Sequence, residues 1–361
     1  MPKIDVNEQL FFSLLGKEYD YSPEFEHLLS SAKAELDEAP QDTAPKAERV
    51  IKIELNDTNR PDLWSTAGLA RLLRMHTGGV SQKKRYQTFL STQATQKDSG
   101  NRRVFVSPEL EHIRPFMTCF VISGKPIDDP MLKDIIQTQE KLCWNFGRKR
   151  RSVSMGVYRS ELISWPLHYR AVDPDAVSFT PLGFDTEMNC TQILNEHPKG
   201  KEYGWILKGC TKVPFLSDAK DGVLSMAPII NSARIGAVQS GDTDLVVELT
   251  GTDMPSLLLA TNIVACDFSD AGYTILPVSV VHPYETGFGK TITTPFYFQS
   301  PTVTTVHAVN KLLGTELERQ DIIEALERMD NTVSAESACL TVSPPAYRND
   351  FLHEVDIIED V

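Results

Sequence analysis

The chain has 361 residues, of which 41% are hydrophobic and 24% are charged, and its formal net charge is −13. A chain of this length can bury two or three hydrophobic cores, so several domains are expected. The acidic balance excludes a surface that binds nucleic acid over its whole extent, because phosphate contacts need positive potential, and no apolar run reaches the roughly 18 residues of a membrane span.

The amino-terminal part is predicted to contain helices, a linker and a strand. An apolar patch from Leu10 to Leu15 ends at Gly16, and Ser22-Pro23 is a typical start for a second helix. Residues 37–48 are acidic, contain two prolines and are predicted to be a linker, whereas residues 50–55 have a strand pattern. A third helix is expected between residues 63 and 73, and a polar stretch at 92–103 suggests a boundary near residue 95.

Short strands and helices are predicted to alternate from residue 104 to residue 282. One expected helix is amphipathic, with an apolar face formed by Leu132, Ile135, Ile136, Leu142, Cys143 and Phe146. The segment 283–299 is rich in Gly, Thr and Pro, so a second boundary is expected there. This central region is predicted to be one mixed α/β domain.

The last segment is predicted to hold two helices and a strand. The first helix ends at Gly314, the second is expected to follow a capping box at Thr315-x-x-Glu318, and residues 338–342 have a strand pattern. These elements resemble a winged-helix-like module. The predicted fold is therefore α+β and multidomain, with an N-terminal domain of helices and strands at 1–95, a central domain at 96–285 and the winged-helix-like module at 295–361.

The most informative pattern places polar side chains where apolar ones are expected. In the β-prone run 244–253, alternation puts Leu245, Val247 and Leu249 on one face and Val246, Glu248 and Thr250 on the other. A dry, unpaired carboxylate within such a strand would cost several kcal/mol of folding free energy. Glu248 therefore lies on a wet strand face or belongs to a ligand site, and the residues alone leave both possibilities open.

Several simpler site types are excluded or left open by the sequence. Gly289-Lys-Thr291 lacks the glycine that a phosphate loop needs five residues earlier, and neither a Gly-x-Ser-x-Gly nor a His-Glu-x-x-His motif occurs.

The six cysteines form no Cys-x-x-Cys pair and are predicted to be buried thiols: 119, 143, 190, 210, 266 and 339. His168 and His197 could carry protons but are more often structural in such settings.

Three basic clusters could contact RNA locally. The strongest is Arg148-Lys-Arg-Arg151, and the weaker ones are Lys83-Lys-Arg85 and Arg102-Arg103. Gly147 followed by cations also suits the end of a helix, where positive charge is favourable. Both interpretations remain open for the first cluster.

Four acids gather near the carboxyl end of the sequence. Asp356, Glu359 and Asp360 lie at i, i+3 and i+4, which places them on one face of a helix, and Asp350 lies just upstream. Oxygen-rich clusters suit magnesium, but acids near a helix amino terminus are also stabilised by the helix dipole. The chemistry alone favours a solvated acidic helix start.

Long runs of specific residues resemble one family. They are Leu224-Ser-Met-Ala-Pro-Ile-Ile-Asn-Ser232 with Glu248-Leu-Thr-Gly-Thr-Asp253, the run from Ile53 to Leu63, Arg148 to Tyr158, His197 to Gly204, and Tyr347 to Asp360. In this order they resemble the phenylalanyl-tRNA synthetase beta subunit of the archaeal and eukaryotic type, over nearly the whole chain. Bacterial relatives carry an oligonucleotide-binding barrel near residues 37–48, where this chain has only a short connection.

The resemblance implies an enzyme subunit with an editing pocket in the central, tRNA-binding domain. Its expected function is to support phenylalanyl-tRNA aminoacylation by the alpha subunit and to hydrolyse mischarged tyrosyl-tRNA(Phe). The positions that match the pocket are Ser225, Asn231, Glu248 and Thr250. Ala227 replaces a proline of many relatives, and Ala237 stands where some have a basic residue.

Partners and cofactors are implied in the same way. Asp350, Asp356, Glu359 and Asp360 match the family's magnesium ligands, and the magnesium ion is shared with the alpha subunit. The alpha subunit uses ATP, so no catalytic residue for aminoacylation is expected on this chain. The expected assembly is a cytoplasmic heterotetramer of two alpha and two beta chains with tRNA(Phe), without membrane or DNA partners. Relatives continue beyond Val361, so a chain shortened at its carboxyl terminus is expected.

Two alternatives remain. The chain could be a non-enzymatic scaffold that docks the alpha subunit and tRNA without active editing, an interpretation that Ala227 and Ala237 favour. It could also be a winged-helix nucleic-acid binder outside translation, although the net charge argues against this.

Overall fold

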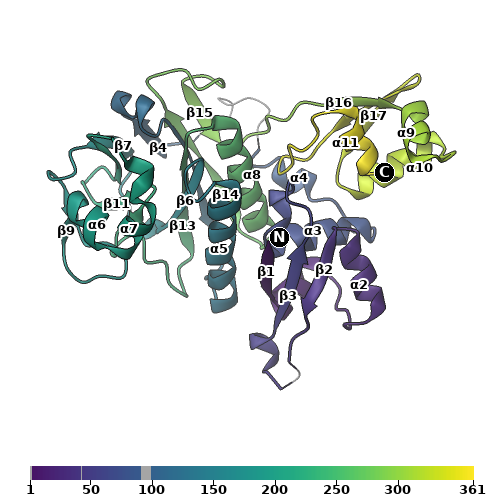
Figure 1. Cartoon of the computed structure of the whole chain (residues 1–361), viewed down its shortest axis with the longest axis horizontal. Helices are drawn as coiled ribbons and strands as arrows, with labels where there is room; N and C mark the ends of the chain where they lie inside the picture. Colours follow the sequence, from purple (N-terminus) through teal and green to yellow (C-terminus); the bar gives the residue numbers. More distant parts are fainter. Residues whose placement is uncertain (1, 42, 91–98) are drawn as a thin grey trace. The chain divides into compact units, whose positions relative to one another are not determined.

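The computed structural model describes residues 2–41, 43–90 and 99–361 (Figure 1). The described chain forms two compact units, one made of residues 1–87 with 297–361 and the other of residues 88–296. The α+β, multidomain fold predicted from the sequence is confirmed. The expected domain limits 1–95, 96–285 and 295–361 stay predictions, and the boundary at 95 lies outside the described residues.

The amino-terminal part of the first unit has a three-stranded antiparallel sheet in the order β1-β3-β2. Helix α1 ends at Gly16, which has a φ of 84°, and α2 begins after Ser22, so both predicted helices are confirmed. The predicted strand at 50–55 is also confirmed. The elements are β1 (Lys3–Asn7), α1 (Glu8–Leu15), α2 (Pro23–Ser30), β2 (Ala34–Glu38), β3 (Val50–Leu55), α3 (Thr66–His76) and α4 (Lys83–Tyr86).

The carboxyl-terminal part of the same unit has a second three-stranded sheet, in the order β16-β18-β17. Its helices bury Val309, Ile322 and Leu326 against strand residues Leu340 and Val342. The elements are β16 (Thr302–Thr305), α9 (Val306–Leu313), α10 (Arg319–Arg328), β17 (Thr332–Glu336), β18 (Cys339–Ser343) and α11 (Glu354–Glu359). The winged-helix assignment of this part stays a prediction.

The capping box predicted at Thr315 is wrong. Helix α10 begins at Arg319, and its capping box is formed by Glu318 and Asp321. The Thr315 hydroxyl instead donates to Asn310 Oδ1, which also accepts from Leu317 N–H. Asn310 therefore holds the turn, and the helix starts three residues later than a helix with Thr315 as its cap would.

The second unit is built on a ten-stranded mixed sheet. Its strand order is β12-β11-β10-β7-β4-β14-β5-β13-β6, with β15 paired to β14. The strands are β4 (Arg103–Val106), β5 (Phe116–Ser123), β6 (Val153–Arg159), β7 (Leu167–Val172), β10 (Val213–Ser217), β11 (Val223–Met226), β12 (Ile230–Asn231), β13 (Asp244–Gly251), β14 (Thr274–Val281) and β15 (Thr291–Thr294). A separate pair is formed by β8 (Ser178–Phe179) and β9 (Met188–Asn189).

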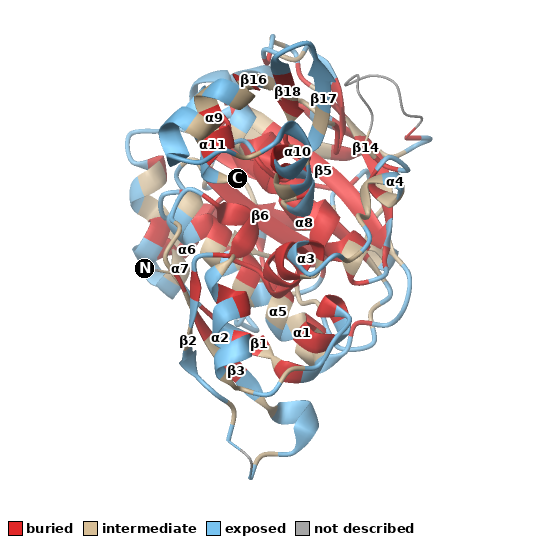
Figure 2. Ribbon diagram, turned by 90° about the vertical axis from the view of Figure 1, so that its right-hand side faces the viewer, coloured by how far each residue is buried: buried red, intermediate tan, exposed pale blue. Residues whose placement is uncertain are grey.

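The described part of this unit also contains α-helices. They are α5 (Asp129–Lys141), α6 (Cys190–Glu196), α7 (Pro198–Tyr203) and α8 (Met254–Asp270), and α5 continues into the π-helical turn η4 (Leu142–Phe146), which ends at Gly147. Figure 2 shows α8 and the strands β5 and β6 as mostly buried. Helix α8 packs on the sheet face opposite Glu248, where Thr118 and Thr261 share a hydrogen bond of 2.6 Å between their hydroxyls.

The structure also bears on the phosphate loop, the cysteine thiols and a membrane-spanning helix. The residues after Gly289 form strand β15 rather than a helix, as the exclusion of a phosphate loop requires. All six cysteines are free thiols, but Cys210 and Cys339 are exposed, so the prediction that every thiol is buried is wrong for these two. Within the described residues, no helix combines the length and apolar content needed to cross a membrane.

Candidate active site

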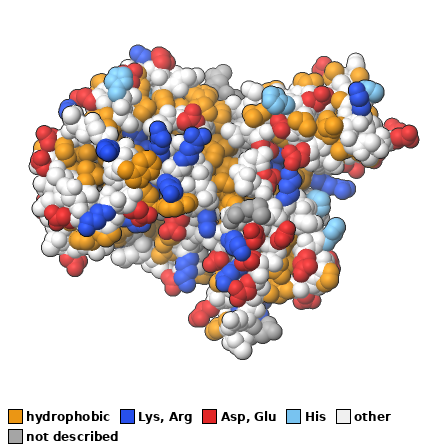
Figure 3. All heavy atoms as spheres, in the orientation of Figure 1, with side chains coloured by type: hydrophobic (Ala, Val, Ile, Leu, Met, Phe, Trp, Pro, Cys, Tyr) orange, Lys and Arg blue, Asp and Glu red, His pale blue; other side chains and the backbone are white. Residues whose placement is uncertain are grey.

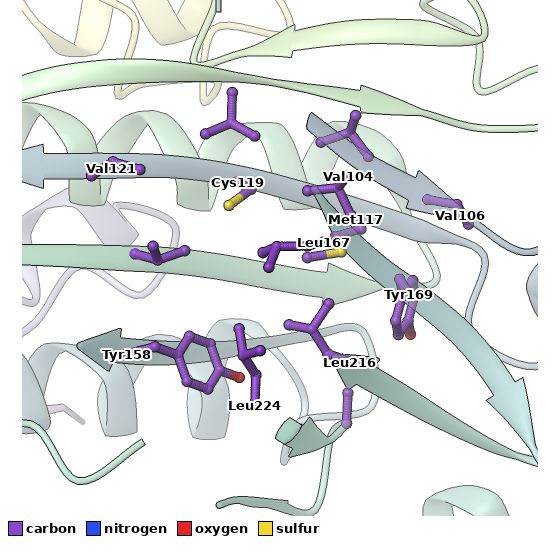
Figure 4. Close-up of a cluster of buried hydrophobic side chains, with 14 of the residues drawn as sticks. Val104, Val106, Met117, Cys119, Val121, Tyr158, Leu167, Tyr169, Leu216 and Leu224 are labelled. Carbon is purple, nitrogen blue, oxygen red and sulfur yellow. The ribbon is translucent and has the colours of Figure 1, made fainter. Parts of the chain in front are cut away.

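Strand β13 lies between β5 and β6 and carries the predicted pocket residues. Glu248 lies opposite Cys119 of β5 and Gly156 of β6. The alternation expected from the sequence is confirmed, because Leu245, Val247 and Leu249 form one buried face while Glu248 and Thr250 belong to the other. Figure 4 shows the apolar cluster around these strands, with Tyr158 projecting from β6 among its side chains.

A cavity of about 320 Å³ opens beside Glu248. This volume is within the range of small-molecule sites, roughly 300–1,000 Å³. Three of the four predicted pocket residues line it, namely Ser225 of β11, Asn231 of β12 and Glu248 of β13. Other lining residues are Leu132, Ile135, Ile136, Gln139, Arg150, Ser154, Met155, Val157, Leu182, Lys199, Met226, Ala227, Pro228, Ile229, Ile230, Gly236, Ala237 and Val238. We refer to this space as the Glu248 cavity.

Glu248 is 3% exposed, and only one of its two carboxylate oxygens has a partner. Oε1 accepts a hydrogen bond of 2.8 Å from the Tyr158 hydroxyl. Among the described residues, Oε2 has no hydrogen-bond partner. Burial raises the pKa of Glu248 to about 7, although the Tyr158 hydrogen bond and the positive charge of Arg114 act in the opposite direction.

The Ser225 hydroxyl, which also lines the cavity, is another buried polar group without a partner among the described residues. It lies beside the Tyr158 hydroxyl but satisfies hydrogen-bond geometry with no described residue. Asn231 belongs to the same group, since its Oδ1 lies 3.4 Å from the Tyr158 hydroxyl. Buried polar atoms are seldom left unpaired, because each costs about 1–3 kcal/mol. Glu248 Oε2 and Ser225 Oγ therefore mark where a ligand with a donor and an acceptor would fit.

Thr250, the fourth predicted residue, does not line the cavity. Its hydroxyl accepts a hydrogen bond of 2.8 Å from Arg114 Nε and lies 3.0 Å from the Ser154 hydroxyl. The Arg114 guanidinium, which is buried, also donates to the Thr250 and Arg151 carbonyls and to Ser154. Thr250 therefore helps to hold the Arg114 guanidinium, whose positive charge acts on Glu248, and contributes no group to the cavity lining.

Sequence reasoning missed three residues that shape the site: Gly156, Tyr158 and Arg114. A Cβ on Gly156 would lie 2.2 Å from the Tyr158 hydroxyl oxygen and 2.7 Å from Glu248 Oε1, so only glycine leaves room for their contact. Ser154, Gly156 and Tyr158 alternate along β6, which was an available signal for a second polar strand face. Arg114 lies in a loop, and no pattern in the sequence links it to β13.

The two histidines lie outside the Glu248 cavity. His197 is buried and caps α7, accepting a hydrogen bond of 3.1 Å from the Lys199 N–H through Nδ1. Burial lowers the pKa of His197. His168 stacks on Phe105, with ring centroids 6.0 Å apart. Both imidazoles therefore have structural contacts.

The basic clusters occupy different settings. Lys83 hydrogen-bonds to the Asn331 carbonyl, and Arg102 hydrogen-bonds to the Pro277 carbonyl. The helix end predicted at Gly147 is confirmed. Arg150 lines the Glu248 cavity and donates to the carbonyls of Pro228 and Ile229 at 3.2 and 3.0 Å. The strongest cluster thus reaches the rim of the candidate site.

The four acids matched to magnesium ligands lie around α11 and have protein partners. Asp350 and Asp360 both accept paired hydrogen bonds from the buried Arg348 guanidinium, at 2.6–3.1 Å. Burial would raise the pKa of Asp350, but Arg348 outweighs this effect and lowers it. Asp356 accepts from the backbone N–H of Leu352 and His353, and Glu359 pairs with Lys33.

This arrangement does not fit a magnesium ion. A cation, Arg348, already lies between the two carboxylates that would have to ligate the metal, and Asp356 is used as a helix cap. Across residues 2–41, 43–90 and 99–361, no group of three or more His, Cys, Asp or Glu side chains is arranged to hold a metal. The magnesium assignment stays a prediction, and no chemical step is derived from it.

Family models match the two ends of the chain. Residues 1–79 match the Phe-tRNA synthetase beta subunit B1 domain, and residues 303–361 match the tRNA synthetase B5 domain. The Glu248 cavity lies between these matched segments in the sequence.

Some relatives match over the whole of this chain, so the match includes the residues that line the Glu248 cavity. The chain is 47% identical to the phenylalanine–tRNA ligase beta subunit of Treponema pallidum and 44% identical to that of Borrelia duttonii. All of this chain is covered in both cases, but it spans only 65% and 62% of the relatives' own lengths.

A solved structure matches the fold over the same extent. The crystal structure of an N-terminal fragment of the phenylalanyl-tRNA synthetase beta subunit from Pyrococcus horikoshii superposes with a TM-score of 0.89 and 32% identity. The match covers 99% of this chain and 98% of the fragment. The chain therefore belongs to the phenylalanyl-tRNA synthetase beta-subunit family.

Proposed function

We propose that the Glu248 cavity binds the tyrosyl group of mischarged tRNA(Phe) and that its ester is hydrolysed there. The observation that carries this proposal is the pair of buried, unpaired oxygens, Glu248 Oε2 and Ser225 Oγ, in a cavity with mainly apolar walls. Apolar walls accept an aromatic ring, and a few placed polar groups fix its orientation.

A phenol complements these two atoms. Its O–H can donate to Glu248 Oε2, and its oxygen can accept from the Ser225 hydroxyl, which is free to rotate. A phenylalanyl group would leave both atoms unpaired at a cost of about 1–3 kcal/mol each. Sites built to hydrogen-bond a substrate hydroxyl can reject the analogue that lacks it by about 10⁴-fold or more, so this arrangement supports tyrosine selectivity.

The proposed reaction is the addition of water to the ester carbonyl carbon, followed by cleavage of the acyl–oxygen bond to the ribose. The products are free tyrosine and tRNA with both ribose hydroxyls restored. In this proposal the phenol is held at Glu248 and the ester extends toward Arg150 and Lys199, which also line the cavity. This chain's contribution is to position the aminoacyl group so that water can attack.

We further propose that the chain supports phenylalanyl-tRNA aminoacylation as the beta partner of an alpha subunit that uses ATP. Relatives named as beta subunits of phenylalanine–tRNA ligase support this role, as do the matched B1 and B5 segments. A cytoplasmic heterotetramer of two alpha and two beta chains that binds tRNA(Phe) follows from the same proposal. Magnesium shared with the alpha subunit would require Asp350 and Asp360 to exchange Arg348 for the ion.

The test is hydrolysis of tyrosyl-tRNA(Phe) and phenylalanyl-tRNA(Phe) by the chain alone and with an alpha subunit. The proposal predicts that the tyrosyl ester is lost at least about tenfold faster, and that Glu248→Ala abolishes this preference. Glu196→Ala, which removes an exposed acid of α6, is the control. Absence of selective hydrolysis in both settings would contradict the proposal and favour the non-enzymatic scaffold.

A further inference from the structure

A second cavity adjoins the Glu248 cavity and shares two of its lining residues. Its volume is about 310 Å³, and Arg150 and Lys199 line both spaces. The other lining residues are Glu140, Lys141, Cys143, Trp144, Asn145, Glu202 and Tyr203. We refer to it as the Trp144 cavity.

Aromatic rings and cations alternate around the Trp144 cavity. The Trp144 side chain is 45% exposed, and Lys149 Nζ lies 5.0 Å from the centre of its ring. The Arg150 guanidinium lies 4.2 Å from the Tyr203 ring, and Lys199 Nζ lies 5.4 Å from it. Aromatic rings that accept stacked bases, combined with cations that contact phosphates, are typical of single-stranded nucleic-acid sites.

The local charge contrasts with that of the chain. Cations lining the cavity are Lys141, Arg150 and Lys199, and the acids are Glu140 and Glu202. Arg148, Lys149 and Arg151 follow in the adjoining turn, so positive charge exceeds negative charge here although the whole chain carries −13. Figure 3 shows Lys and Arg side chains interspersed with apolar ones on the face it presents. An acidic protein can contact phosphates only through such a local patch.

The backbone turn that presents these cations is strained. Arg148, Lys149 and Arg150 have φ values of 50°, 55° and 69°, so three consecutive residues other than glycine adopt the left-handed conformation. The turn is held by hydrogen bonds of 2.8 Å from Lys149 N–H to the Trp144 carbonyl and 2.7 Å from Arg150 N–H to the Cys143 carbonyl. Strain held in this way concentrates at functional sites.

Arg150 joins the two cavities through its contacts. While its guanidinium lies over Tyr203, its Nη1 donates to the carbonyls of Pro228 and Ile229, which line the Glu248 cavity. A molecule that occupies both spaces must pass beside this side chain.

We propose that the Trp144 cavity binds the terminal adenosine and adjoining phosphates of the single-stranded 3′ end of the tRNA. This inference rests on the proposed function, because the ester links the amino acid in the Glu248 cavity directly to the terminal ribose. The adenine ring stacks on Trp144, the Asn145 amide faces its polar edge, and Lys141 and Lys199 contact the backbone phosphate. The nucleoside and the amino acid thus occupy adjoining spaces.

The experiment is binding of the RNA trinucleotide CCA to the chain, measured by calorimetry at several salt concentrations. Trp144→Ala is expected to weaken binding about tenfold and Trp144→Phe to restore most of it, because the phenyl ring keeps a stacking face. Trp205→Ala is the matched control, since Trp205 is 48% exposed but lines neither cavity, and binding should stay within twofold of the parent. Lys199→Ala should reduce the salt dependence, with Lys201→Ala of the same helix as its control.

Equal effects of Trp144→Ala and Trp205→Ala, or a salt dependence of binding that Lys199→Ala leaves unchanged, would overturn the inference. The same variants are assayed for hydrolysis of tyrosyl-tRNA(Phe), where loss of nucleotide contacts should raise KM more than it lowers kcat. Trinucleotide binding that needs Trp144 without any selective hydrolysis would refute the proposed function alone. Selective hydrolysis with unchanged KM in Trp144→Ala would refute the nucleotide site alone.

Discussion

The Tyr158 hydroxyl donates a hydrogen bond of 2.8 Å to Glu248 Oε1, at the point where Gly156 lies opposite Glu248 in the sheet. One carboxylate oxygen is therefore occupied by a phenol of the protein itself, and the other has no partner among the described residues. In the proposed function Tyr158 is a positioning residue, because it fixes which oxygen of Glu248 faces the ligand.

Tyr158→Phe should impair selectivity more than it impairs folding. Without the hydroxyl, both oxygens of Glu248 are unpaired and the pKa of the carboxyl rises further, because the hydrogen bond that lowers it is gone. We expect about a tenfold loss of selective tyrosyl-ester hydrolysis and a shift of its pH profile to higher pH. If the pH profile of hydrolysis is the same in Tyr158→Phe as in the parent protein, Tyr158 does not act through Glu248.

Gly156→Ala should separate Tyr158 from Glu248 by steric exclusion. The added Cβ would lie 2.2 Å from the hydroxyl oxygen, so the strand or the side chains must move. Overpacking of this kind typically costs about 1–3 kcal/mol of stability. Chemical denaturation measures the cost, and Gly204→Ala is the control because its Cβ would meet the end of the flexible Leu194 side chain at 3.3 Å and the Leu194 carbonyl oxygen at 3.9 Å, an ordinary contact.

The stability of the chain should depend on pH through Glu248. The pKa is raised from an ordinary 4.5 to about 7 in the folded protein, so the protonated form is favoured by folding. Relative to Glu248→Gln, the contribution of protonated Glu248 to the free energy of unfolding is fully present below about pH 4.5. It is lost as the pH rises through about 7. At about 1.4 kcal/mol for each pH unit, the difference approaches about 3 kcal/mol.

Denaturant unfolding of both proteins at pH 4.5 and pH 8 measures this difference. Glu196→Gln should follow the parent at every pH, since its carboxyl is exposed. A constant difference between the parent and Glu248→Gln across this range would contradict the raised pKa.

Removal of divalent metal should leave the thermal stability of this chain unchanged. Asp350 and Asp360 already pair with Arg348, and Asp356 is satisfied by backbone N–H groups. Thermal unfolding with EDTA and with excess magnesium should therefore give the same Tm. A magnesium-dependent increase would show that the ion displaces Arg348 in the isolated chain.

Arg348→Leu should be strongly destabilising. It leaves two largely buried carboxylates without the cation that they share, although Asp350 keeps Arg60 at 4.0 Å, and breaking a buried pair in this way typically costs about 3–5 kcal/mol. Denaturant unfolding checks the value, with Lys311→Leu at an exposed position as the control. A loss below about 1 kcal/mol would mean that solvent already screens these acids.

Local patterns in the sequence were sufficient to predict much of the fold. Two helices end at Gly16 and Gly314, and another begins after Ser22, as expected. These helix ends were predictable because they depend on neighbouring residues alone. The error at Thr315 has a comparable local cause, since Asn310 competes for the turn. Cys210 and Cys339 are exposed, which residue type alone does not reveal.

The candidate site could be predicted only in part. Period-two alternation placed Glu248 and Thr250 on one face, but their different partners come from distant segments: Tyr158 is 90 residues from Glu248, and Arg114 is 136 residues from Thr250. Such pairings depend on strand order, which periodicity does not determine. The resemblance identified Ser225, Asn231 and Glu248, whereas the exclusion of Thr250 from the cavity required the structure.

The most direct measurement is the affinity of the chain for two adenosines that carry a tyrosyl or a phenylalanyl group through a stable 3′-amide. We predict that the tyrosyl compound binds at least about tenfold more tightly and that Ser225→Ala and Glu248→Ala each reduce this preference. Equal affinities for the two compounds in the parent protein would contradict the claim that Glu248 Oε2 and Ser225 Oγ recognise the phenol.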